Sequence, residues 1–383
     1  MDRCPPRATL TFGGSVPSID RTGSPRLGPM RITANQVTLL RLVFLPIPCA
    51  LLFEADWQKA LALAFFVVIG LTDYLDGYLA RKQGPTKLGA LIDPIADKIF
   101  VAAMFIPLVR MEAVPVWMAV LLFVREFLVT ELRGMHGVAG VEFRTAELAK
   151  YKTTIQMIGG GIVILNVIFG PHRGVLLPLG GFFLFALALA AVTYFRSGRL
   201  GPRILTFVGL VGWALGMRCI FSYTTTNWAI MALVVGVTLA SGIQYLLQSW
   251  RGLKVDLGRL GPRGRANSLG IGIAFPVIFI SSLHFKEVSA WMILVIVALE
   301  FVNGGLRTTL SGSVDPSDRS GEILRTVSLL GAGLCGLALP LLLPWDSTAI
   351  LNALFLGMAL ASAVHCARGL YVHRRALMLG CRS

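Results

Sequence analysis

The sequence predicts an all-α polytopic membrane protein with about twelve spanning helices, six in each half of the chain. The first observation behind this fold class is composition: 55% of the 383 residues are hydrophobic and only 14% are charged, and the mean hydropathy is +0.73. Ordinary soluble domains do not have this balance. The second is that apolar residues gather in runs of about 20, the length that a helix needs to cross a bilayer.

Residues 1–30 differ from the rest of the chain because they are rich in Pro, Gly, Ser and Arg. They lack the continuous apolar segment of a cleavable signal peptide. We therefore expect a disordered N-terminal tail, with Met30 as an alternative start. The six cysteines of the chain follow no paired spacing, so they suggest neither a zinc site nor a disulfide framework.

The remaining chain divides into apolar segments separated by polar turns. In the first half the expected spans are 35–53, 60–73, 92–109, 114–132, a fifth that opens at 150–157, and 176–194. In the second half they form three hairpins: 204–222 with 228–249, 267–283 with 289–306, and 323–343 with 348–367. The hexapeptide Gly198–Arg203 recurs letter for letter at Gly258–Arg263, which indicates similar units joined by basic connectors.

Four aspartates lie inside and beside the apolar segments of the first half, on two consecutive helices. The positions that share a face are Asp73, Asp76, Gly77 and Ala80 on the first helix, and Gly89, Asp93 and Asp97 on the second. Spacings of three and four residues produce such faces. Two of them turned toward each other would form an oxygen-rich cage for divalent cations, with bare backbone where a bulky ligand can approach. The pattern predicts a diphosphate site.

An alternative is that these acids are structural ion pairs or line a water-filled crevice. A charge at membrane depth costs roughly 2.5 to 3.5 kcal/mol even on insertion scales, and four acids together repel one another. Arg81 supplies one compensating positive charge and Lys98 is a candidate for another. Two divalent cations would neutralise the negative charge that remains on the four aspartates.

The same residues carry a resemblance to a known family. Asp73-x2-Asp76-Gly77-x2-Ala80-Arg81, seven further residues, and Gly89-x3-Asp93-x3-Asp97 resemble the signature of the CDP-alcohol phosphotransferases. The resemblance implies a six-helix membrane enzyme that moves a phosphatidyl group from a CDP-linked lipid to an alcohol and releases CMP. In this chain about six further transmembrane helices follow that bundle.

The resemblance also implies roles for these residues. Two Mg²⁺ or Mn²⁺ ions would bridge the diphosphate of CDP-diacylglycerol, and Asp97 would also act as general base on the acceptor hydroxyl. The implied metal ligands are Asp73, Asp76, Asp93 and Asp97. The implied contacts of the CDP-lipid are Gly77, Ala80 and Arg81.

Asn35, Thr38 and Arg41 resemble the usual opening of the family's first helix. Arg41 is a cation on an otherwise apolar helix. Two interpretations stay open for it: a salt bridge to one of the aspartates, or direct contact with a ligand.

The acceptor is suggested by a second set of residues. Arg125-Glu126 on the fourth span and Lys150-x-Lys152-Thr153 before the fifth resemble one branch of the family, the phosphatidylglycerophosphate synthases, which implies glycerol 3-phosphate as acceptor. An acceptor that carries its own phosphate needs a second anion pocket, and Arg125, Lys150 and Lys152 are cations at the same membrane face. The alternative is that the two lysines are ordinary loop charges.

The second half retains none of these motifs. We therefore expect three parts: a tail at 1–30, a catalytic membrane domain at 31–198 that carries all the chemistry, and a membrane domain of helical hairpins at 199–383 without a catalytic motif. The last part is either a vestigial copy of the first or an unrelated accessory domain.

Basic residues concentrate in alternate loops. By the positive-inside rule, this places both termini and the aspartate motif in the cytoplasm, in a multi-pass protein of the cell (inner) membrane. The net charge of +15 then suits anionic lipid and does not require nucleic acid. The partners expected are CDP-diacylglycerol, glycerol 3-phosphate and membrane lipids, with a homodimer left open.

Two rival functions remain. A cardiolipin synthase of the same family would use phosphatidylglycerol as acceptor. An ion-coupled transporter could also have two six-helix halves with intramembrane acids. Against the transporter, the aspartates lie within about 12 Å of one helix end, taking 1.5 Å per residue from Asp73 to Arg81.

Overall fold

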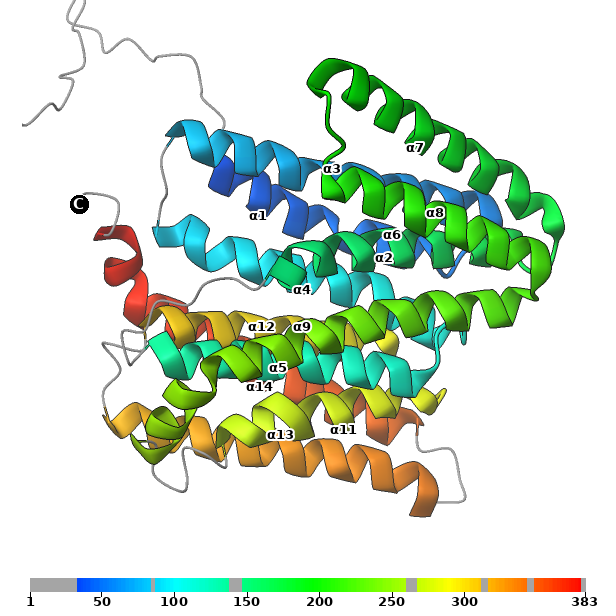
Figure 1. The fold of residues 1–383 in the computed structure, drawn as a ribbon. Helices are drawn as coiled ribbons and strands as arrows, with labels where there is room; N and C mark the ends of the chain where they lie inside the picture. Colours follow the sequence, from blue (N-terminus) through cyan, green and yellow to red (C-terminus); the bar gives the residue numbers. More distant parts are fainter. Residues whose placement is uncertain are drawn as a thin grey trace, which may run out of the picture.

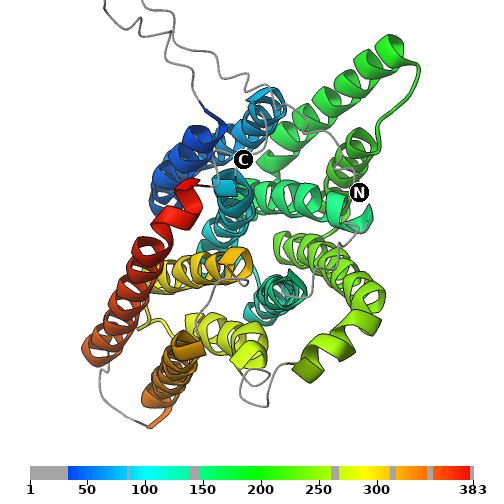
Figure 2. The ribbon, with the colours of Figure 1, turned by 90° about the vertical axis from the view of Figure 1, so that its left-hand side faces the viewer.

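The structure is a computed structural model, and it describes residues 33–83, 87–137, 147–259, 267–310, 316–342 and 348–379. All regular secondary structure in these ranges is helical, and they contain no strand. The helices run side by side as a single bundle (Figures 1 and 2). The predicted all-α fold class is confirmed.

The first half contains a helix at each expected span. Its elements are α1 (Ala34–Phe44), α2 (Pro46–Leu51), α3 (Asp56–Gln83), α4 (Lys87–Arg110), α5 (Val116–Gly137), α6 (Glu147–Phe169), the 3₁₀ turn η1 (Arg173–Val175) and α7 (Leu176–Ser197). Thr33 and Gln36 form a capping box that starts α1. The first span is interrupted at Leu45, because Pro46 cannot donate the backbone hydrogen bond that would continue α1.

The second half also has a helical segment at each expected span. Its elements are α8 (Pro202–Ile220), α9 (Tyr223–Arg259), the π-helical turn η2 (Gly270–Ala274), α11 (Phe275–Ser281), the 3₁₀ turn η3 (Ser282–His284), α12 (Ala290–Leu310), α13 (Pro316–Leu342) and α14 (Thr348–Leu379). Within η2, a Cβ added to Gly272 would lie 3.3 Å from the Cα of Leu128. The glycine therefore permits η2 to pack closely on α5.

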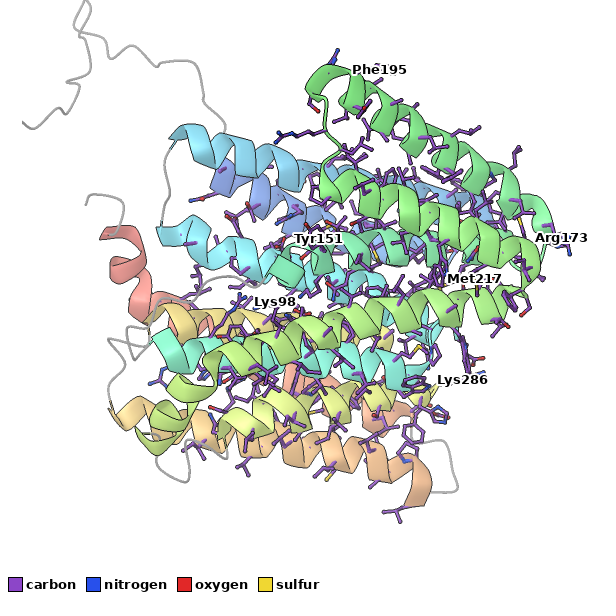
Figure 3. All side chains as sticks on the ribbon, viewed as in Figure 1. Lys98, Tyr151, Arg173, Phe195, Met217 and Lys286 are labelled. Atoms are coloured by element: carbon purple, nitrogen blue, oxygen red, sulfur yellow. The ribbon has the colours of Figure 1, made fainter. Side chains whose placement is uncertain are left out.

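Seven of the described helices are long and apolar enough to cross a membrane. Helices α3, α4 and α5 have 28, 24 and 22 residues and also carry the charged motifs. Large apolar side chains point outward, above all on α7, where Leu177 is 84% and Phe195 is 85% exposed. Figure 3 shows Phe195 directed away from the bundle. The chain is a multi-pass membrane protein, since such a surface needs lipid around it.

The two halves share one hydrophobic core. Helix α12 packs on α4 and α5, while α9 packs on α5 and α6. Phe127 of α5 stacks on Phe301 of α12, with ring centroids 4.1 Å apart and an interplanar angle of 8°, and it also contacts Phe275 edge-on at 5.1 Å. Helix α5 is therefore enclosed by elements of the second half.

A buried ion cluster joins α12, α13 and α5. Glu300 is 1% exposed, and Arg325 binds both of its carboxylate oxygens at 2.6 and 2.8 Å. Arg307 binds Glu300 at 3.0 Å and Glu131 at 3.2 Å. Two acids and two arginines balance each other in this cluster, which is how a protein tolerates charge at membrane depth.

We predict that Glu300→Ala destabilises the fold, because Arg325 stays buried and loses the carboxylate that it binds. Breaking a buried ion pair by removing one member typically costs about 3–5 kcal/mol. The measurement is the thermal unfolding midpoint of the detergent-solubilised protein. The control is Asp56→Ala, whose carboxylate is 70% exposed and pairs only locally with Lys59, a kind of contact worth about 0–1 kcal/mol. Equal midpoints for the two variants would contradict the prediction.

Candidate active site

Helices α1 and α4 bring two of the predicted aspartates into contact with the family's opening residues. The Oγ1 of Thr38 donates a hydrogen bond to Asp93 Oδ1 at 3.0 Å. The guanidinium of Arg41 forms an ion pair with Asp97 at 3.5 Å. The salt-bridge interpretation of Arg41 is therefore confirmed. The Arg41 side chain is 1% exposed while that of Asp97 is 39% exposed, so α1 holds Asp97 from one side and leaves its other side open.

Positions 73–81 of the aspartate motif are helical and belong to α3, as predicted. The side chains of Asp73, Asp76, Gly77, Ala80 and Arg81 lie outside the part of the chain that the structure describes. The Lys150 side chain also lies outside it, although its backbone opens α6.

The α3–α4 hairpin sets the level of position 73 relative to Asp93. Only residues 84–86 separate the two helices, and short connections join antiparallel neighbours. The rings of Phe66 and Phe100 meet edge-on at 5.7 Å. Position 73 lies seven residues after Phe66, and Asp93 lies seven residues before Phe100. Seven residues are about two helical turns, so both positions lie at the same level, near the end of the bundle where the hairpin turns.

The residues that the structure describes contain no cluster of three or more side chains suited to a metal ion. Asp93 and Asp97 nevertheless lie one turn apart on one face of α4, and both are solvent-accessible. Carboxylate oxygens are the ligands that Mg²⁺ and Mn²⁺ prefer. The described part of the predicted ligand set thus has the right donor chemistry for these ions.

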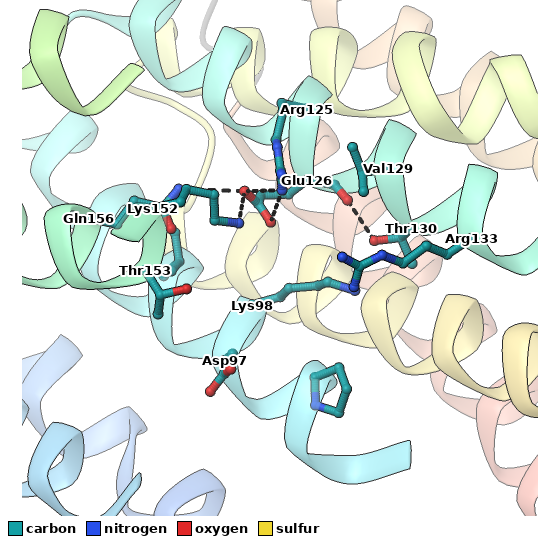
Figure 4. Close-up of a pocket in the computed structure, with 12 residues that line it drawn as sticks. Asp97, Lys98, Arg125, Glu126, Val129, Thr130, Arg133, Lys152, Thr153 and Gln156 are labelled. Atoms are coloured by element: carbon teal, nitrogen blue, oxygen red, sulfur yellow. Dashed lines mark hydrogen bonds and ion pairs between the residues drawn. The ribbon is translucent and has the colours of Figure 1, made fainter. Parts of the chain in front are cut away.

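A cavity of about 230 Å³ opens between α4, α5 and α6, beside Asp97 (Figure 4). It contains three of the predicted site residues: Asp97, Arg125 and Lys152. The other residues lining it are Pro94, Lys98, Val101, Glu126, Val129, Thr130, Arg133, Thr153 and Gln156. Lys98 and Tyr151 both lie in the half of the bundle nearer the α3–α4 turn (Figure 3). Two of the three expected acceptor cations, Arg125 and Lys152, thus line the same cavity as Asp97, the expected general base.

Glu126 is the centre of a buried hydrogen-bond network in this cavity. It is 4% exposed and accepts from Lys152 Nζ at 2.6 Å, Arg125 Nη1 at 3.3 Å and Gln156 Nε2 at 3.5 Å. The Lys152 side chain is only 11% exposed. Lys152 is thus a largely enclosed charge on α6 that pairs with Glu126, and not a loop charge.

The lining of the cavity is cationic overall. Four of its residues are basic and two are acidic, which leaves two positive charges in excess. Lys98, Arg133 and Gln156 were not among the predicted site residues. Helical spacing could have found two of them, because Arg133 lies two turns after Glu126 and Gln156 lies one turn after Lys152.

Comparison with known proteins covers the segment that carries this site. The family model for CDP-alcohol phosphatidyltransferase matches residues 31–193. The CDP-diacylglycerol--glycerol-3-phosphate 3-phosphatidyltransferase of Rickettsia typhi is 35% identical over 139 residues, which are 36% of this chain and 78% of that protein. The protein of the same name from Bacillus subtilis is 34% identical over 146 residues, 34% of this chain and 76% of its own length. No solved structure matches the chain at a significant level.

The chain belongs to the CDP-alcohol phosphatidyltransferase family. It is a membrane transferase of that class, and its membership decides against the transporter alternative. The family match ends at residue 193, before α8 begins.

Proposed function

We propose that the protein transfers the phosphatidyl group of CDP-diacylglycerol to sn-glycerol 3-phosphate, which gives phosphatidylglycerophosphate and CMP. The observation that carries this proposal is the cavity beside Asp97, with its two excess positive charges. An acceptor with its own dianionic phosphate complements that excess. The names of the relatives from Rickettsia typhi and Bacillus subtilis agree with this acceptor.

The size of the cavity also favours a small acceptor. Pockets that enclose drug-sized ligands have volumes of about 300–1,000 Å³, whereas this one has about 230 Å³. Phosphatidylglycerol, the acceptor of a cardiolipin synthase, would have to place its headgroup here while both acyl chains pass between helices.

The proposed roles combine the family resemblance with the positions of Arg125, Lys152 and Asp97 around the cavity. Arg125, Lys150 and Lys152 bind the phosphate of the acceptor. Its 1-hydroxyl then lies at Asp97, whose carboxylate takes the proton as the oxygen attacks the phosphorus of the phosphatidyl group. The bond from this phosphorus to the CMP oxygen breaks, and CMP leaves with the electron pair. Arg41 keeps the carboxylate in place through its ion pair.

The CDP-lipid is assigned to the α3 side of the site. Gly77 and Ala80 leave room for the cytidine nucleotide, and Arg81 binds its phosphate. Two Mg²⁺ or Mn²⁺ ions would be held by Asp73, Asp76, Asp93 and Asp97, and when bound they would neutralise the charge that develops on the diphosphate.

We further propose that this end of the bundle faces the cytoplasm, in the cell (inner) membrane. Arg173 and Lys286 lie at the opposite end (Figure 3), where the sequence has few other cations. The positive-inside rule then assigns the α3–α4 turn to the cytoplasmic side.

The test of the proposed function is CMP release by the purified full-length protein in detergent with CDP-diacylglycerol and Mg²⁺. We expect CMP with glycerol 3-phosphate and none with phosphatidylglycerol. CMP that appears only with phosphatidylglycerol would show a cardiolipin synthase instead, and no CMP with either acceptor would overturn the proposed activity.

We predict that Asp97→Asn abolishes turnover but retains binding of CDP-diacylglycerol, because the amide keeps the shape of the side chain and cannot accept the proton. Loss of a general base typically lowers the rate by about 10² to 10⁴, and loss of a metal ligand would add to this. Turnover and lipid binding are measured separately, with Asp56→Asn on the exposed start of α3 as control. A near-normal rate would remove Asp97 from the mechanism.

We predict that Lys152→Ala raises KM for glycerol 3-phosphate about ten-fold or more, with a much smaller effect on KM for CDP-diacylglycerol. The variant removes one of the cations that bind the phosphate of the acceptor. A hydrogen bond to a charged group is worth about 1.5–3 kcal/mol. Initial rates over both substrate concentrations give the two constants. Lys59→Ala serves as the control, because Lys59 lies at the start of α3 and pairs with Asp56. Parallel increases in both constants would indicate a structural role for Lys152.

A further inference from the structure

Helix α9 lies outside the segment that the family model matches, yet it contacts the proposed acceptor site. The match covers residues 31–193, and α9 spans Tyr223–Arg259. Helix α9 packs along both α5 and α6, the helices that supply Arg125 and Lys152.

Two hydroxyl groups of α9 bind cavity residues directly. Ser241 Oγ accepts a hydrogen bond from Arg125 Nη2 at 2.8 Å. Thr238 Oγ1 accepts one from Gln156 Nε2 at 3.1 Å. Ser241 and Thr238 are 1% and 0% exposed, so no solvent competes for these contacts.

The direction of both contacts is fixed by α9 itself. Ser241 Oγ donates its proton to the carbonyl of Thr238 at 2.9 Å, and Thr238 Oγ1 donates its proton to the carbonyl of Val234 at 2.7 Å. A hydroxyl has a single proton, so each oxygen can only accept from its partner on α5 or α6. The two residues therefore present lone pairs to Arg125 and Gln156.

Gly242 lets the stem of Arg125 lie against the backbone of α9. A Cβ at this position would be 2.9 Å from Arg125 Cγ and 3.4 Å from Nε. Because Cγ lies near the root of the side chain, it cannot move aside without displacing the guanidinium. The absence of a side chain at 242 is thus part of how Arg125 reaches Glu126 and Ser241.

A free arginine side chain samples many rotamers, and fixing it costs up to about 2 kcal/mol of entropy. Here Arg125 is held by Glu126 at one nitrogen and Ser241 at another. The entropy of Arg125 is therefore lost when the protein folds and not when the acceptor binds. Preorganisation increases affinity in this way.

We propose that α9 is a wall of the acceptor site, in which Ser241 and Gly242 position Arg125 for the phosphate of the acceptor. Thr238 positions Gln156, which in turn binds Glu126, the partner of Arg125 and Lys152. This inference rests on the proposed function. It departs from the expectation that residues 199–383 contribute nothing to the chemistry, because a helix of that segment sets the affinity for the phosphorylated acceptor.

The first test is Ser241→Ala in the full-length protein. We expect KM for glycerol 3-phosphate to rise about two- to ten-fold, the usual effect of losing one hydrogen bond, with KM for CDP-diacylglycerol and kcat little changed. Ser241→Thr, which keeps the accepting oxygen, should restore the wild-type KM. The control is Ser282→Ala, since Ser282 is equally buried and, in the described contacts, its hydroxyl bonds only to the carbonyl of Phe279.

The second test compares two glycines at close helix contacts. Gly242→Ala introduces a methyl group against Arg125, while Gly333→Ala introduces one 2.7 Å from Ile278 Cγ2, away from the cavity. Both variants should lower the unfolding midpoint, and only Gly242→Ala should raise KM for glycerol 3-phosphate selectively.

The outcomes separate the two proposals. Wild-type protein that releases no CMP with glycerol 3-phosphate overturns the proposed function and this inference together. An active wild-type protein whose Ser241→Ala and Gly242→Ala variants keep the wild-type KM for glycerol 3-phosphate, or change both KM values equally, overturns this inference alone and leaves α9 a packing element.

Discussion

Glu126 and its partners determine the geometry of the site. A carboxylate at this depth would be costly alone, and the Lys152 and Arg125 cations would repel each other without it. Glu126 accepts from both cations and from Gln156, so it fixes α5 against α6 and orients the two cations in the same step. Helix α9 adds two further contacts to the network, from Ser241 to Arg125 and from Thr238 to Gln156.

The described residues contain a second buried acid, Glu300, and its cluster differs from that of Glu126 in charge balance. Around Glu300, two acids meet two arginines, and the charges cancel. Around Glu126, the cavity has four basic and two acidic residues, and charge remains to be compensated. A buried cluster in charge balance stabilises packing. The described lining of the cavity beside Glu126 keeps an excess of positive charge, which supports the proposed acceptor with its own phosphate.

Much of the fold could be predicted because membrane spans follow from local composition. Every expected span coincides with a helical segment, and the α3–α4 motif is recognisable because its spacing alone puts the acids on helix faces. The pairing of Arg41 with an aspartate was also one of two interpretations open from the sequence. The role of α9 could not be predicted in this way. Ser241 and Thr238 look like ordinary small polar residues of an apolar span, and Ser241 is 116 positions away from Arg125. Only the packing of the folded chain reveals that contact.

The same packing changes how the two segments of the chain relate to each other. A catalytic unit ending near residue 198 would leave α5 without α9 on one side and without α12 on another, although Phe127 of α5 stacks on Phe301 of α12. Lys98 of the cavity also lies over the Phe301 ring, 5.8 Å from its centroid. The helices that line the proposed site thus pack on two sides against helices outside the family match. Residues outside the catalytic motif can therefore still change the affinity for the acceptor. The reason is that the position of a buried cation depends on every helix that encloses it.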